Sequence, residues 1–210
     1  MANQSGQIYG LTVLSPILER DGLDISHATA LRWYLAGLPR DHTSPLARVS
    51  GTHFARLVVM DDVVFVGAPA REEHLKSRYL IFETNFDGDL DPYLIRMAQE
   101  VPDFVNSVWQ HCVGYPGVAD LAAFATYMKK CQIETTFFFA DVNNKTVQEN
   151  LKALQVQSAL GHFVESNQGK PAAEVQKSFG LLLDRLAKAP APLPGGIDSE
   201  KTAAEDRPYD

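Results

Sequence analysis

The stretch THFARLVVMD, residues 52–61, decides the class of fold that the sequence predicts. It is rich in β-branched and apolar residues, which is typical of a strand. Its alternating positions form two sets, His53, Ala55, Leu57 and Val59 on one face and Phe54, Arg56, Val58 and Met60 on the other. A strand with one solvated face alternates cleanly between apolar and polar residues, and this one does not. We therefore expect both faces of its sheet to be covered.

Outward from this strand, the pattern of apolar residues predicts an alternation of strands and helices. Further strands are expected at 7–17, 77–86 and 134–142, and helices at 24–39, 91–101, 102–112, 118–131, 146–166 and 171–188. The stretches 41–51 and 67–77 are expected to be loops. The order is that of a ferredoxin-like β-α-β-β-α-β sandwich, an α+β fold, with extra helices in the second crossover and at the C-terminus. One sheet face would pack on the crossover helices, and the other on the C-terminal helices or on a second copy of the chain.

The sequence predicts a single domain over residues 1–188 and a disordered tail over 189–210. The quartet TVQE at 146–149 matches a capping box and indicates a helix start. From residue 189 the chain is rich in proline, alanine, glycine and charge without periodicity, so it cannot bury enough surface to order itself. The tail is either a plain extension or a peptide that binds a protein partner.

Composition excludes several classes of function. The 210 residues carry a net charge of −7, and 45% of them are hydrophobic. Lysine and arginine do not cluster, so neither a nucleic acid nor an anionic membrane surface is an expected partner. No apolar run approaches the roughly 20 residues that span a bilayer. Two cysteines and no visible secretory signal favour a cytoplasmic protein.

Three stretches carry a resemblance to a known family: THFARLVVMDD (52–62), LIFETNFDGDLDPYL (80–94) and HCVGYP (111–116). They are similar to an uncharacterised family of bacterial proteins with motifs of the type HFARxVxxDD, FExNFDG and HCxGYP. The similarity extends over residues 7–165, but relatives often carry Gly-Arg near Asn144 and Lys145, where this chain departs. The resemblance implies a ferredoxin-like fold, similar to dimeric α/β-barrels, in a module that sometimes lies beside peroxidase- or catalase-like parts. It implies no established activity.

The strand end FETNFDGD, residues 82–89, gathers polar side chains where a strand turns into a helix. One interpretation is a turn in which Gly88 adopts positive φ and an aspartate caps the helix. The other is that Asp87 and Asp89 bind a cation. A calcium loop is closed by a bidentate glutamate, which the following residues lack, so no metal site is predicted. Asn85 and Asp87 remain candidates for ligand binding.

A second group of candidates lies within the strands themselves. His53 and Arg56 are three residues apart and are expected on opposite faces of one strand. Glu83, on the neighbouring strand, is expected beside either of them, depending on register. These groups either satisfy one another as partly buried polar residues or form a cavity with an acid/base pair of His53 and Glu83. A carboxylate-oriented imidazole titrates near neutral pH, which suits catalysis. We take His53, Glu83 and Arg56 as the candidate catalytic residues.

The turn HCVGYP supplies His111, Cys112 and Tyr115 as candidate ligand-binding residues. A helix C-terminus with Gly114 as its cap accounts for most of this motif. Structural zinc is not expected, because the required ligand pairs are absent. Haem ligation by His111 or Cys112 is chemically allowed.

Two hypotheses follow from these residues. The first is a protein, either a monomer or a homodimer, that binds a small apolar or aromatic molecule or haem near the sheet and performs redox or oxygen chemistry on it. The second is a non-catalytic accessory module that uses the same surface to bind a protein partner.

Overall fold

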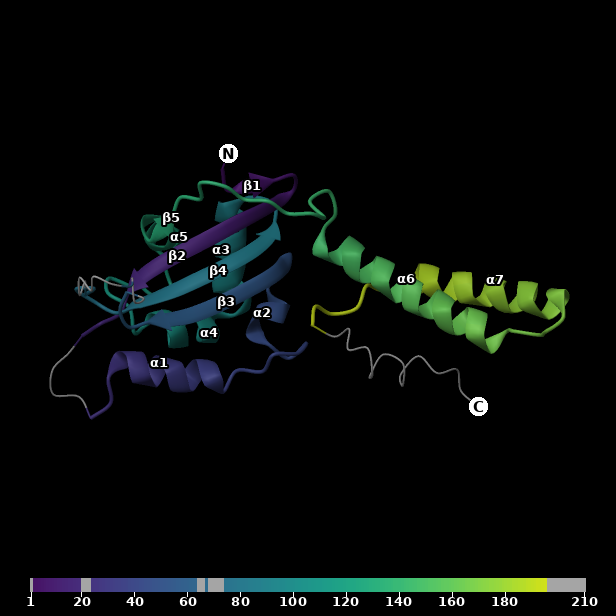
Figure 1. Ribbon diagram of the computed structural model, residues 1–210, viewed down its shortest axis with the longest axis horizontal. Coiled ribbons are helices and arrows are strands. Elements are labelled where there is room, and N and C mark those ends of the chain that lie inside the picture. The colour runs from purple at the N-terminus through teal and green to yellow at the C-terminus, as the bar shows by residue number, and fades with distance from the viewer. Residues whose placement is uncertain (1, 20–23, 64–66, 68–73, 196–210) are drawn as a thin grey trace.

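The computed structural model of the chain describes residues 2–19, 24–63, 67 and 74–195. It is an α+β protein with a five-stranded antiparallel sheet and seven helices in the described residues (Figure 1). The strands are β1 (Gln4–Ser5), β2 (Ile8–Pro16), β3 (Thr52–Met60), β4 (Tyr79–Asp87) and β5 (Gln132–Ile133). The helices are α1 (His27–Ala36), α2 (Pro45–Arg48), α3 (Leu90–Glu100), α4 (Pro102–Trp109), α5 (Leu121–Lys130), α6 (Val147–Ser166) and α7 (Ala172–Lys188).

The sheet has the order β1-β2-β4-β3, and β5 pairs with β2 as well. Strand β4 lies between β2 and β3 and alternates between buried and half-buried residues along its whole length. The helices α3, α4 and α5 lie behind the sheet in Figure 1 and cover one of its faces. The expected strands at 7–17, 52–61 and 77–86 are confirmed within one or two residues at each end.

The core lies between this covered face and the helices behind it. Phe86 of β4 stacks on Tyr93 of α3, with ring centroids 3.7 Å apart, and Phe82 meets Trp109 of α4 edge-on at 5.3 Å. All four rings are fully buried. Aromatic pairs of this kind add to the stabilisation that burial of their apolar area provides. This packing fixes β4, whose C-terminal end carries the candidate site.

The other face of the sheet, called the outer face below, differs from the expectation that both faces are covered. On β3, Phe54 is 49% exposed and Val58 is 40% exposed, and Ile133 of β5 is exposed as well. The C-terminal helices do not cover this face, because α6 and α7 form a hairpin that projects away from the sheet (Figure 1). Part of this face, at Gly10, is instead covered by Phe138, and the structure of one chain does not test the second copy expected from the sequence.

The expected strand at 134–142 is wrong. Pairing with β2 is limited to Gln132 and Ile133, and the residues that follow are irregular. The reason is competition for one edge, because β1 already pairs with the first residues of β2. The segment is held instead by isolated bonds, such as the one from the Thr135 N–H to Oδ1 of Asn3 at 2.9 Å. Phe137, which the strand would have placed in a core, is 81% exposed.

The α6–α7 hairpin has a small core of its own, and it begins as the sequence predicts. Thr146 and Glu149 form the expected capping box at the start of α6. Ala159 packs against Leu182 and Leu186 of α7, and these three are buried. Lys152 donates to the carbonyls of Leu186 and Ala189, at 2.7 and 2.6 Å.

Three smaller regions complete the comparison with the sequence. The expected loop at 41–51 contains the short helix α2. Most of the expected loop at 67–77 lies outside the described residues. So does the tail from residue 196 onward, while 189–195 are described and contain no helix or strand.

Candidate functional site

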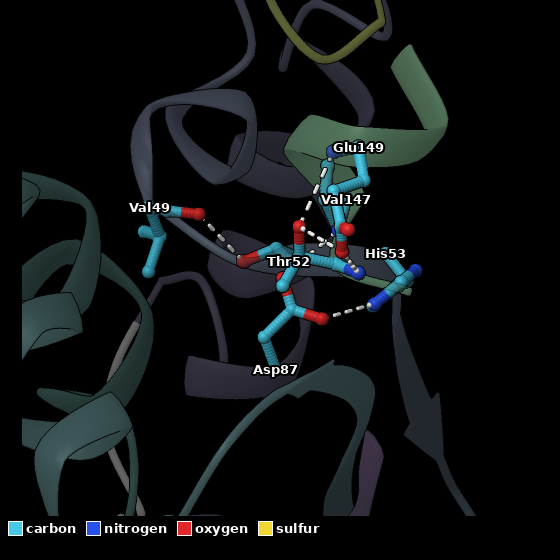
Figure 2. Close-up of polar contacts among 7 residues, drawn as sticks. Val49, Thr52, His53, Asp87, Val147 and Glu149 are labelled. Atoms are coloured by element: carbon cyan, nitrogen blue, oxygen red, sulfur yellow. Dashed lines mark hydrogen bonds and ion pairs between the residues drawn. The ribbon is translucent and has the colours of Figure 1, made fainter. Parts of the chain in front are cut away.

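The site begins with an irregularity in β3 next to the end of β4. The register between the two strands shifts between Thr52 and Phe54, so that His53 is an extra residue in the ladder, a β-bulge. Its Nε2 lies 2.7 Å from Oδ1 of Asp87, the last residue of β4 (Figure 2). Both side chains are mostly buried, with 19% of His53 and 17% of Asp87 exposed. The bulge therefore creates a carboxylate–imidazole pair.

The second oxygen of Asp87 joins the pair to the C-terminal hairpin. Asp87 Oδ2 accepts a hydrogen bond from the Val147 N–H, 3.0 Å away, at the first residue of α6 (Figure 2). The first N–H groups of a helix have no partner within the helix and carry its positive dipole end. The Thr146 hydroxyl accepts from another of these N–H groups, that of Glu149, at 3.2 Å. Asp87 is thus fixed from two sides and orients His53.

A pocket opens beside His53. It has a volume of about 320 Å³ and lies between the end of α1, the α2 region, β3 and the described end of the chain. Most of its lining is apolar, and the set is Leu35, Leu38, Pro39, Arg40, Asp41, Ser44, Leu46, Ala47, Thr52, His53, Phe54, Ala55, Pro194 and Gly195. Such a volume is at the lower end of the range of roughly 300–1,000 Å³ found for ligand sites.

His53 lines this pocket and leaves one ring nitrogen without a partner among the described residues. When Nε2 donates to Asp87, the neutral ring leaves Nδ1 as an acceptor, and the protonated ring carries an N–H there. Nδ1 has no hydrogen-bond partner within the described ranges. An imidazole held by a carboxylate with its other nitrogen free is the arrangement used in general acid/base catalysis.

Of the two partners open to Glu83 from the sequence, the structure has Arg56, and the acid/base pair of His53 with Glu83 is not formed. Glu83 lies directly opposite Arg56 in the sheet register and accepts a hydrogen bond from Arg56 Nε at 2.8 Å. The bulge also places His53 on the side of β4 that carries Asp87 and Glu83, and so on the side of Arg56 rather than opposite it. Arg56 and Glu83 form an ion pair on the outer face, and neither lines the pocket beside His53.

Asn85 and the residues of the HCVGYP turn lie away from the pocket. Asn85 sits on the outer face between Phe54 and Gly10 in register. The Tyr115 hydroxyl donates to Asn106 at 2.8 Å, and burial raises the pKa of this phenol. Cys112 is 2% exposed within the core, and burial raises the pKa of its thiol to about 12. A buried neutral thiol is a poor ligand, so these surroundings give the expected ligand role of Cys112 no support.

His111 has a partner that sequence reasoning missed. Its Nδ1 lies 3.0 Å from Nδ1 of His27, the first residue of α1. Burial, followed by the charge of His27, lowers the pKa of His111. This geometry gives no support to the haem-ligand role that the sequence allows for His111 or Cys112. His111 is paired with His27, and Cys112 is buried in the core. Neither residue lines the pocket beside His53.

The pair of His53 and Asp87 was missed although both residues were candidates. Its signal in the sequence is the run of polar residues at the ends of two adjacent strands. A bulge leaves no trace in residue spacing, however, and α6 is 60 residues away from Asp87 along the chain.

The chain was compared with protein-family models, curated proteins and solved structures, and nothing matched in any of the three comparisons. Within the described ranges, no helix combines the length and apolar character needed to cross a membrane.

Proposed function

We propose that the protein binds a small, mostly apolar molecule in the pocket beside His53 and exchanges a proton with it. The observation that carries the proposal is the 2.7 Å bond between His53 and Asp87 at the wall of a pocket with apolar lining. Asp87 orients the ring, and Nδ1 accepts a proton from the ligand or returns one. The pocket volume of about 320 Å³ favours a molecule of one ring or a short chain over a porphyrin.

The test is ligand binding with a matched pair of variants. Small aromatic and aliphatic compounds are screened by thermal shift and then titrated against the protein while the imidazole signals are followed by NMR. Hits should shift the His53 signals and bind at least about 10-fold more weakly to His53→Gln. His162→Gln, on α6, serves as the control and should bind normally. A screen without hits, or hits that bind His53→Gln as tightly as wild type, would reject this function.

The topology supports a finer assignment of the fold, which we also propose. Without β1, the strands run in the order β5-β2-β4-β3, with the last strand beside the first. This is the order of a ferredoxin-like sheet with a much shortened final strand. It agrees with the family resemblance of the HFAR, NFDG and HCxGYP motifs.

A second candidate function is that of an interaction module, and the outer face of the sheet favours it. Phe54 and Val58 are exposed on either side of the Arg56–Glu83 ion pair. A two-fold axis along the strands between β3 and β4 would place Arg56 of one copy over Glu83 of the other. Such a face is complementary to itself, as a symmetric dimer requires. We therefore propose a second copy of the chain as its partner.

Light scattering after size-exclusion chromatography tests this dimer. Wild type should have twice the mass of one chain, and Arg56→Glu should shift it toward the monomer because a glutamate at position 56 then faces Glu83 of the other copy. The double variant Arg56→Glu/Glu83→Arg should restore the dimer. A monomeric wild-type protein would reject the module as a homodimer and leave the pocket proposal intact.

A further inference from the structure

We infer that the molecule bound beside His53 is a monocarboxylate, with one carboxylate group on an apolar body. This inference rests on the proposed function and adds the chemical class of the ligand. It follows from the charged groups at the pocket and from the size of its apolar wall.

The first observation is a free cation. Arg40 lines the pocket and forms no hydrogen bond or ion pair with any described residue. A guanidinium carries five N–H donors in a planar fork, and its best partner is a carboxylate that accepts two of them. With His53 in the same lining, two donors of positive or potentially positive charge face one small volume.

The nearby carboxylates have partners other than Arg40. Oδ1 of Asp41 accepts from the backbone N–H and the hydroxyl of Thr43, at 2.8 and 2.6 Å. These bonds hold the pKa of Asp41 below its ordinary value, so it stays charged. Asp87 is bound by His53 and by the Val147 N–H. Neither aspartate is paired with Arg40, whose charge is left for a ligand.

The charges at the pocket favour a ligand with a single negative charge. Arg40 is the one cationic side chain without a partner among the described lining residues, and Asp41 is a negative charge in the same lining. One additional anion can pair with Arg40 while His53 remains with Asp87. A dianion such as a phosphate monoester would meet the field of two fixed carboxylates with no second free cation among the described lining residues.

The apolar lining defines the rest of the molecule. Leu35, Leu38, Leu46 and Phe54 are the large apolar side chains of the wall, around a volume of about 320 Å³. That space holds a phenyl ring or a chain of a few carbons, whose apolar surface is stabilised when it leaves water. A carboxylate at Arg40 then lies in the same small pocket as His53.

Isothermal titration with matched ligands tests the inference. The probes are phenylacetate and hexanoate, their uncharged amides phenylacetamide and hexanamide, and phenyl phosphate as a dianion. The carboxylates should bind about 10-fold or more tightly than the amides and the phosphate. Arg40→Gln should remove this preference, while Arg185→Gln, an arginine on α7, should keep it.

The outcomes separate this inference from the proposed function. Amides that bind as tightly as carboxylates, in a manner sensitive to His53→Gln, would overturn the carboxylate and keep the pocket function. A carboxylate preference that survives in Arg40→Gln, or tighter binding of phenyl phosphate, would also overturn the inference. Failure of every probe to bind would overturn it together with the small apolar ligand on which it rests.

Discussion

Replacement of Asp87 by alanine should destabilise the protein, because it removes the contact between the end of β4 and the start of the C-terminal hairpin. Asp87 accepts from His53 at 2.7 Å and from the Val147 N–H at 3.0 Å. Hydrogen bonds to a charged group contribute roughly 1.5–3 kcal/mol each, and the partial exposure of this pair places both near the lower limit. We therefore expect Asp87→Ala to lower the free energy of unfolding by about 3 kcal/mol, from two bonds at that limit.

Urea denaturation followed by circular dichroism measures this loss. With a slope of about 2 kcal/mol per M, the midpoint should fall by roughly 1.5 M. Asp87→Asn should cost about half as much, because the amide oxygen still accepts from Val147. Asp141→Ala is the control, since this exposed carboxylate has no hydrogen-bond partner among the described residues.

A double-mutant cycle with His53→Gln isolates the contact between the two side chains. A coupling energy of about 1 kcal/mol or more is expected if the pair is formed in solution. Equal midpoints for Asp87→Ala and Asp141→Ala, or a coupling near zero, would refute the reasoning that Asp87 fixes His53 and α6.

Three further predictions concern the rest of the fold. The lowered pKa of His111 means that the unfolded chain binds a proton below about pH 6.5 more readily than the folded one. The melting temperature should therefore fall from pH 7.5 to pH 5, and it should fall less in His111→Gln. An equal fall in wild type and in His111→Gln would show that His111 is not the cause. Iodoacetamide at pH 8 should label half-buried Cys131 and leave buried Cys112 unlabelled. Mass spectrometry of the native and the urea-unfolded protein measures this labelling, and equal labelling in the native state would contradict the burial of Cys112. Gly10→Ala should lose about 1–3 kcal/mol in calorimetry, because the new Cβ would lie 2.9 Å from the ring of Phe138. Gly161→Ala is the control: it lies in a helix with open space around it and should gain up to about 1 kcal/mol of stability. A Gly10→Ala variant as stable as wild type would show that Phe138 does not pack on Gly10.

Local patterns in the sequence predicted the elements whose signals are contained in their own residues. Strands β2, β3 and β4 follow from runs of β-branched and apolar side chains, and the start of α6 follows from Thr146 and Glu149 three positions apart. The candidate residues His53 and Asp87 were identified because they are polar in or beside apolar strands. Each of these inferences needs only neighbours within a few positions along the chain.

The tertiary structure decided which side chains meet. The register of β3 on β4 places Glu83 opposite Arg56, which donates to it. One extra residue in the ladder turns His53 toward Asp87. The expected strand at 134–142 fails because β1 pairs with part of the edge of β2 that it would need.

The sequence by itself determined an α+β chain with polar residues at the end of its central strands. Only the folded chain decided that a carboxylate of β4 bridges an imidazole of β3 and the first turn of α6. The physical reason is that periodicity records which face of an element is apolar. Strand register, bulges and contacts between distant segments depend on interactions that form only after the elements have packed together.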